Sequence, residues 1–122
     1  MPSLRQHQGT SAEQQAAEFL LAKGFELIDR HVSSRYGEID LLMRDGSTRL
    51  TAGGKTIVAV EVKARTSNSH GRAIESIGPS KMQKLSDAFH DILEQRGWSN
   101  QPYRIDVVTI EPSGVEHIES VG

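Results

Sequence analysis

Several residue types that carry common chemistry are absent or scarce in this chain of 122 residues. It has no cysteine, which excludes disulfides and thiolate metal sites. Aromatic residues make up 5% of the chain and charged residues 25%, a composition typical of an ordinary globular protein. No apolar run approaches the roughly 20 residues needed to span a bilayer, and residues 1–7 lack the apolar core of a signal peptide. We therefore expect one cytoplasmic domain covering residues 1–122.

An excess of positive charge is also missing. The formal net charge is −2, which counts against a protein that coats nucleic acid through bulk electrostatic attraction. The same value is compatible with a small enzyme that has a local basic rim around an acidic site. Net charge alone does not choose between nucleic-acid enzymes and other classes.

Hydrophobic periodicity predicts an α/β domain. Helical spacing predicts two helices, and period-two alternation predicts four strands with a short edge strand near the C-terminal end. The predicted helices cover 10–23 and 80–96, the strands cover 25–30, 37–44, 56–65 and 103–110, and the edge strand covers 115–118. Ser80 is expected to cap the second helix, and a polar turn is expected through Ser33, Ser34 and Arg35.

The strands at 37–44 and 56–65 combine charge with signs of burial. Glu61 and Lys63 share a strand face with Ile57 and Ala59, so that face is expected to be partly covered. Carboxylates in such a place are costly unless they pair with a cation or bind a metal ion. Two explanations stay open: a metal-binding cluster, or a cross-strand ion pair between Asp40 and Lys63 on a sheet with one wet face.

Four segments in order give this pattern specificity. They are Gly9-x-x-x-Glu13-x-x-Ala16, residues 37–41 (GEIDL), residues 60–65 (VEVKAR) and residues 104–107 (RIDV). Together they resemble the bacterial YraN-like family, which is assigned to the PD-(D/E)xK nuclease superfamily with Holliday junction resolvases and many restriction enzymes. The resemblance implies a restriction-endonuclease-like fold, an αβββαβ core with a central mixed sheet flanked by helices.

The resemblance also implies a site. Asp40 and Glu61 would ligate a metal ion, the Val62 carbonyl would add an oxygen, and Lys63 would orient the attacking water or stabilise the phosphorane. Glu38 shares the Asp40 face and would stand beside the ligands. Clustered carboxylates without cysteine or a histidine pair favour Mg²⁺ or Mn²⁺ over zinc.

Glu13 has two explanations. Thr10-x-x-Glu13 has the spacing of a capping box at a helix N-terminus. In resolvase-like relatives, an acid of the first helix joins the metal-binding cluster, so the resemblance makes Glu13 a catalytic candidate.

Basic residues near the cluster are candidates for binding DNA. Arg65 follows Lys63 on the same strand face, and Arg72 lies in a loop rich in serine, asparagine and glycine. Lys81 and Lys84 occupy the first turn of the second helix, where lysines are disfavoured unless an anion such as phosphate binds there. DNA is the expected partner; a homodimer, as in junction resolvases, is left open.

Two residues depart from the family pattern. His31 stands where asparagine is usual, in what we expect to be a turn away from the acidic cluster, and Ala59 stands where phenylalanine is common. Three functions remain: a metal-dependent endonuclease acting on branched or damaged DNA, a nucleic-acid-binding module without turnover, and a structural or assembly protein with ion-paired strands. The presence of all four candidate catalytic residues argues against the second function, the binding module; these residues are Glu13, Asp40, Glu61 and Lys63.

Overall fold

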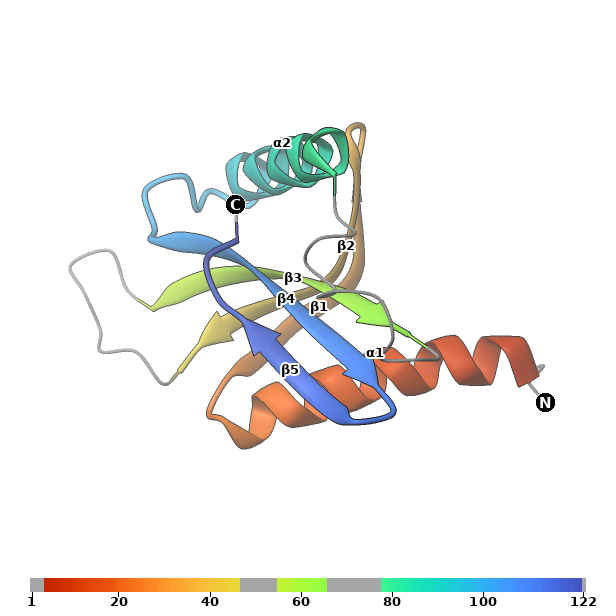
Figure 1. Ribbon diagram of the computed structural model, residues 1–122. Coiled ribbons are helices and arrows are strands. Elements are labelled where there is room, and N and C mark those ends of the chain that lie inside the picture. Colours follow the sequence, from red (N-terminus) through yellow and green to blue (C-terminus); the bar gives the residue numbers. More distant parts are fainter. Residues whose placement is uncertain (1–3, 47–54, 66–77, 122) are drawn as a thin grey trace.

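A five-stranded mixed sheet lies between two helices (Figure 1). This computed structural model describes the backbone of residues 4–46, 55–65 and 78–121, and the side chains from residue 12 onward within those ranges. In chain order the elements are α1 (Leu4–Ala22), β1 (Glu26–Ser34), β2 (Gly37–Asp45), β3 (Thr56–Ala64), α2 (Pro79–Gln95), β4 (Tyr103–Glu111) and β5 (Gly114–Ile118).

The sheet follows the chain order, β1-β2-β3-β4-β5. Strands β1, β2 and β3 form an antiparallel meander, β4 runs parallel to β3, and β5 returns antiparallel to β4. Helix α2 lies in the connection between β3 and β4, as a parallel pair requires a crossover. The predicted α/β succession of one helix, three strands, a helix and a strand is therefore confirmed, and β5 is the predicted edge strand.

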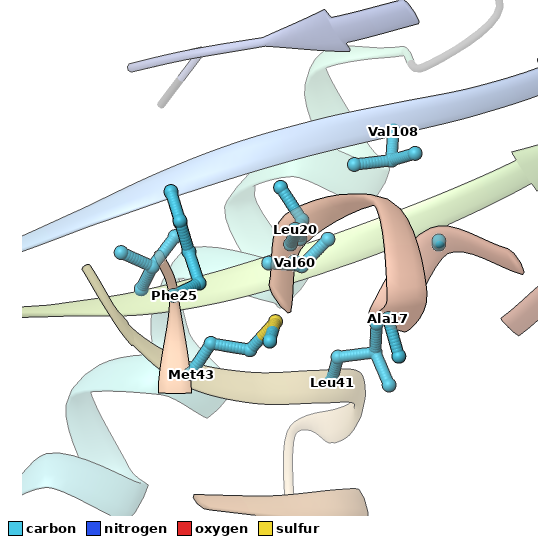
Figure 2. Close-up of a cluster of buried hydrophobic side chains, with 9 residues drawn as sticks. Ala17, Leu20, Phe25, Leu41, Met43, Val60 and Val108 are labelled. Carbon is cyan, nitrogen blue, oxygen red and sulfur yellow. The ribbon is translucent and has the colours of Figure 1, made fainter. Parts of the chain in front are cut away.

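Helix α1 covers one face of the sheet. Its residues Ala16, Ala17 and Leu20 are fully buried against residues of β2, β3 and β4. Figure 2 shows this cluster, in which Leu41, Met43, Val60 and Val108 surround the helix residues. The two alanines carry only a methyl group each, which allows the helix to approach the strands closely.

Helix α2 covers the opposite face. Phe89 and Ile92 pack there with Ile39, Leu42 and Ala59 of the sheet. Ala59 is fully buried although it is much smaller than phenylalanine. Because a helix covers each face, the charges that share a face with Ala59 lie in a partly dry environment, as the strand pattern predicts.

Both predicted helix starts are wrong. Helix α1 begins at Leu4, so Thr10 lies inside it and the capping-box explanation for Glu13 fails. Helix α2 begins at Pro79 with Gly78 at the N-cap, where no side chain makes a capping hydrogen bond. Proline suits a helix start because its φ is already helical and no backbone N–H is wasted. Neither helix in the described residues is long and apolar enough to cross a membrane.

The predicted end of the first strand is also wrong. Strand β1 continues to Ser34, so Ser33 and Ser34 belong to the strand rather than to a turn. His31 lies inside this strand with a φ of 51°. Asparagine tolerates such a left-handed conformation better than most residues do, which explains why it suits this position.

A substitution at Gly46 tests how tightly the end of β2 packs. A Cβ at Gly46 would overlap the carbonyl oxygen of Gly24, which follows α1. We expect Gly46→Ala to lower the free energy of unfolding by roughly 1–3 kcal/mol through overpacking, measured by urea denaturation. A Cβ at Gly78 would meet nothing within 4 Å, so Gly78→Ala should cost under about 1 kcal/mol. Equal effects of the two substitutions would contradict this packing.

Candidate active site

Strands β2 and β3 separate at the end where the predicted acids lie. Their paired residues run from Asp45–Thr56 to Leu41–Val60. At the next residue of β2, a side chain replaces the backbone pairing: Asp40 Oδ2 accepts a hydrogen bond of 2.9 Å from the Val62 N–H. This bond fixes the Asp40 carboxylate against the segment of β3 that carries Glu61 and Lys63.

Asp40 and Glu61 form a carboxylate pair in a partly dry setting. Burial raises the pKa of Asp40, although the hydrogen bond from Val62 opposes the shift. Glu61 is only 8% exposed. Burial, followed by repulsion from the Asp40 charge, raises the pKa of Glu61. Each carboxylate is therefore harder to ionise than in water, and a nearby cation would favour the ionised pair.

Two lysines stand beside these acids. The Nζ of Lys81, in the first turn of α2, lies 3.2 Å from Glu61 Oε1. Hydrogen bonding to Lys81, followed by burial, lowers the pKa of Lys63. The ion pair of this cluster thus joins Glu61 to α2. The alternative pair between Asp40 and Lys63 is not formed.

A histidine connects two further acids to the cluster. His31 Nε2 lies 2.6 Å from Glu13 Oε1 on α1, and His31 Nδ1 lies 2.9 Å from Glu38 Oε1 on β2. On β1, His31 lies between Arg30 and Val32, whose β2 partners flank Asp40. The expectation that this departure leaves the acidic cluster untouched is therefore wrong. Sequence reasoning missed the contact because it ended the strand too early.

The bridge from Glu13 through His31 to Glu38 predicts a pH-dependent stability. The hydrogen bond to Glu38 and the charge of Glu13 raise the pKa of His31 above its ordinary 6.5, against an opposing effect of burial. A raised histidine pKa stabilises the fold fully below the ordinary value, and this contribution is lost as pH rises through the folded value. Because His31 is about half exposed, we expect at most about 1 kcal/mol.

The variant His31→Asn tests this bridge and keeps a residue that accepts positive φ. Urea denaturation of both proteins at pH 5.5 and pH 9 would give the difference in their unfolding free energies. That difference should shrink at the higher pH. A difference that does not change with pH would contradict a protonated bridge.

The carboxylates of Asp40 and Glu61 would suit a hard divalent ion that takes few ligands from the protein. Within the part of the chain that the structure describes, no three histidine, aspartate or glutamate side chains are arranged to hold a metal ion by themselves. Mg²⁺ is usually bound by only one or two protein carboxylates, with water and substrate phosphate completing its shell. Asp40 and Glu61, which repel one another and share a partly buried site, match that requirement.

Two of the four candidate DNA-binding residues lie in a pocket with acids of the cluster. Lys81 and Lys84 line a surface pocket of about 180 Å³ together with Glu38 and Glu61. Arg65 directly follows β3, and its N–H donates to the Ile110 carbonyl. Arg72 lies outside the described residues. The structure thus brings the two lysines of α2 to the acids.

A second charged cluster lies on the α1 face of the sheet. Asp106 is fully buried and accepts hydrogen bonds from Arg104 Nε at 2.9 Å, His117 Nε2 at 2.7 Å and the Ser120 N–H at 3.1 Å. Arg104 Nη2 also lies 2.8 Å from Asp45, which is buried as well. Arg104 and Asp106 are separated by one residue on β4, so they lie on the same face of the sheet and form an ion pair within one strand.

Comparison with known proteins identifies the family. The model of "Uncharacterised protein family UPF0102" matches residues 12–110. The chain belongs to the UPF0102 family. This confirms the YraN-like resemblance, and the matched region contains Glu13, Asp40, Glu61 and Lys63.

Relatives in several bacteria match most of the chain. A UPF0102 protein of Vibrio cholerae is 35% identical over 115 residues, covering 93% of this chain and 87% of its own. One from Stutzerimonas stutzeri is 40% identical over 110 residues, covering 89% and 85%. One from Neisseria gonorrhoeae is 39% identical over 108 residues, covering 88% and 87%.

Among solved structures, SfsA of Pyrococcus furiosus in complex with Ca²⁺ is 14% identical, and the match covers 94% of this chain and 63% of that one. Its TM-score of 0.28 is too low to compare the folds.

Proposed function

We propose that this UPF0102 protein is a metal-dependent endonuclease of the PD-(D/E)xK type, which hydrolyses DNA phosphodiester bonds in branched or damaged DNA. One observation carries the proposal: the fold holds Asp40 and Glu61 together at the separation of β2 and β3, with Lys63 and Lys81 beside them. The two carboxylates alone would only bind a cation. Together with the adjacent lysines, they would also activate water and stabilise the charge on the phosphate.

The acids would hold Mg²⁺ or Mn²⁺ in this scheme. A bound divalent ion acidifies water and acts as a Lewis acid toward a phosphoryl oxygen. Asp40 is held in place by the Val62 N–H, and Glu61 by Lys81. Such anchoring limits the rotation of both carboxylates before substrate arrives, and so less conformational freedom is lost on binding.

Lys63 would act on the water and the phosphate. Its lowered pKa makes a neutral Nζ easier to reach, and a neutral Nζ could accept the proton of the attacking water. As an ammonium it would donate hydrogen bonds to the phosphate oxygens, where charge develops in the transition state. Lys81, in the first turn of α2, and Lys84, in the second, would bind neighbouring phosphates.

The direct test is incubation with linear, nicked, single-stranded and four-way-junction DNA in Mg²⁺, Mn²⁺ or EDTA. We expect cleavage only with a divalent ion, fastest on the form that the protein recognises, and its loss in Asp40→Asn. If metal ions and DNA bind but no form is cut, the non-catalytic binding module is the better account. If neither metal ions nor DNA bind, the strand charges are structural and the proposal is wrong.

A further inference from the structure

An exposed aromatic side chain stands at the rim of the candidate site. Tyr36 follows the end of β1 and is 42% exposed, while most large apolar side chains of the described residues are at least partly buried. Tyr36 lines the pocket that contains Glu61 and Lys81. The Arg35 guanidinium lies 4.9 Å from the centroid of its ring. Tyr36 thus presents a partly exposed aromatic ring, in contact with a cation, beside the acids Glu38 and Glu61.

Tyr36 also lines a second pocket, of about 300 Å³. Arg35 contributes to this pocket from the same turn, and α2 contributes Asp87, His90, Asp91 and Glu94. His90 is held by the Ser86 carbonyl at 2.8 Å and the Tyr103 hydroxyl at 3.1 Å. Tyr36 is therefore shared by two neighbouring pockets, one beside the acids of the site and one further along α2.

The charges of α2 differ between the two pockets. In the first pocket Lys81 and Lys84 offset the charges of Glu38 and Glu61. In the second pocket the carboxylates of Asp87, Asp91 and Glu94 outnumber the guanidinium of Arg35. Phosphate groups are attracted to the lysines and repelled by the carboxylates. A neutral group with hydrogen-bond donors would have the opposite preference. A nucleotide offers both parts, because its phosphate is anionic and its base is neutral.

We propose that the second pocket receives one unpaired nucleobase, stacked on Tyr36, while the adjoining phosphate lies at Lys81 and Lys84. This inference rests on the proposed function and names the feature of the substrate that is recognised. Aromatic side chains bind unstacked bases of any sequence through their π faces. The carboxylates would accept hydrogen bonds from an exocyclic amino group, which cytosine, adenine and guanine have and thymine lacks.

The test is a binding titration in EDTA, where cleavage plays no part. The probes are three DNA duplexes: one with a bulged cytosine, one with an abasic residue at the bulge, and one fully paired. Base stacking contributes roughly 1–3 kcal/mol per base, so the bulged cytosine should bind roughly 5- to 160-fold more tightly than the abasic duplex. A bulged thymine should bind more weakly than the cytosine.

Three variants assign the preference to Tyr36. Tyr36→Ala should lose most of the preference for the bulged-cytosine duplex over the abasic duplex, and Tyr36→Phe should keep it. Leu21→Ala, which removes an exposed apolar side chain from α1, should also keep it. Thermal unfolding of each variant checks that the fold survives.

The outcomes separate this inference from the proposed function. Equal wild-type affinity for the bulged-cytosine and abasic duplexes would overturn the inference, and the cleavage assay would still stand by itself. A preference that is undiminished in Tyr36→Ala would overturn it as well. A preference lost only in Tyr36→Ala would support it even for a protein that cuts no DNA.

Discussion

The variant Glu61→Gln is expected to lose metal-dependent cleavage and to unfold at a higher temperature than the wild type in EDTA. Loss of a group that only supports a metal ligand already costs about 10–100-fold, so loss of the ligand should reduce the rate by at least about 100-fold. Initial cleavage rates on the preferred DNA form measure the first effect. Thermal unfolding at pH 8 measures the second.

The gain in stability follows from the direction of the pKa shift. Burial and the Asp40 charge raise the pKa of Glu61 in the folded protein, against the attraction of Lys81. Ionising Glu61 therefore costs stability, which falls as pH rises through the interval between the ordinary and the raised pKa. Above that interval the cost is complete, and glutamine removes it. Each 1 kcal/mol regained would raise Tm by roughly 2–8 °C.

A matched variant and added metal sharpen this result. Glu116 is an exposed glutamate on β5, and Glu116→Gln should change neither cleavage nor Tm. Mg²⁺ should raise the Tm of the wild type but not that of Glu61→Gln, because an ion that binds only the folded state stabilises it. A Glu61→Gln protein that is less stable at pH 8 would contradict the account of the carboxylate pair.

The variant Asp106→Asn is expected to lose about 3–5 kcal/mol of unfolding free energy, the usual cost of breaking a buried ion pair on one side. Asparagine lacks the charge that pairs with Arg104, and its NH₂ group would face donors on Arg104 or His117. Lys23 Nζ, a donor, lies 2.7 Å from His117 Nδ1. His117 Nε2 must therefore be the atom that donates to Asp106. Urea denaturation at pH 7 measures the loss.

The pH dependence and a nearby control test the same point. Burial favours a higher pKa for Asp106, but the hydrogen bonds from His117, Arg104 and Ser120 outweigh it and lower the pKa. The stability from Asp106 is thus present above its unfolded pKa and lost as pH falls through the folded value. Glu119, 3.6 Å from Arg104 but exposed, should contribute under about 1 kcal/mol. A similar loss in Glu119→Gln would show that burial does not set the cost.

The alternation of apolar and polar residues along the sequence predicts the strands and the charged face that carries Asp40, Glu61 and Lys63. Asp40, Glu61 and Lys63 alternate with apolar residues, and Ile57 and Ala59 on the charged face indicated cover on both sides. The family resemblance supplied the pairing of these two segments. Covered faces and adjacent strands are what bring Asp40 to Glu61 in the structure.

Other contacts could not be predicted because they depend on how distant elements meet. The bridging position of His31 requires β1 to extend beyond Arg30 through a residue with positive φ. The pairing of Lys81 with Glu61 depends on where α2 crosses the sheet. The burial of Asp45 could have been predicted, because Asp45 lies on the same strand face as the apolar residues Leu41 and Met43. Alternation alone does not identify Arg104 as its partner.

The central claim is that the residues around the separation of β2 and β3 hydrolyse DNA with a divalent ion, and Lys63 tests it most directly. Lys63→Ala leaves both carboxylates in place and removes the group expected to handle the proton of water or the phosphate charge. Lys55→Ala is the control, because Lys55 precedes β3 at its other end and pairs with Glu26.

The measurement is the initial rate of DNA cleavage by the wild type and both variants in Mg²⁺, Mn²⁺ and EDTA. We predict cleavage by the wild type and Lys55→Ala with either ion, none in EDTA, and a rate about 10²–10⁴-fold lower for Lys63→Ala. Cleavage that persists in EDTA, or that is equally fast in Lys63→Ala, would contradict the claim.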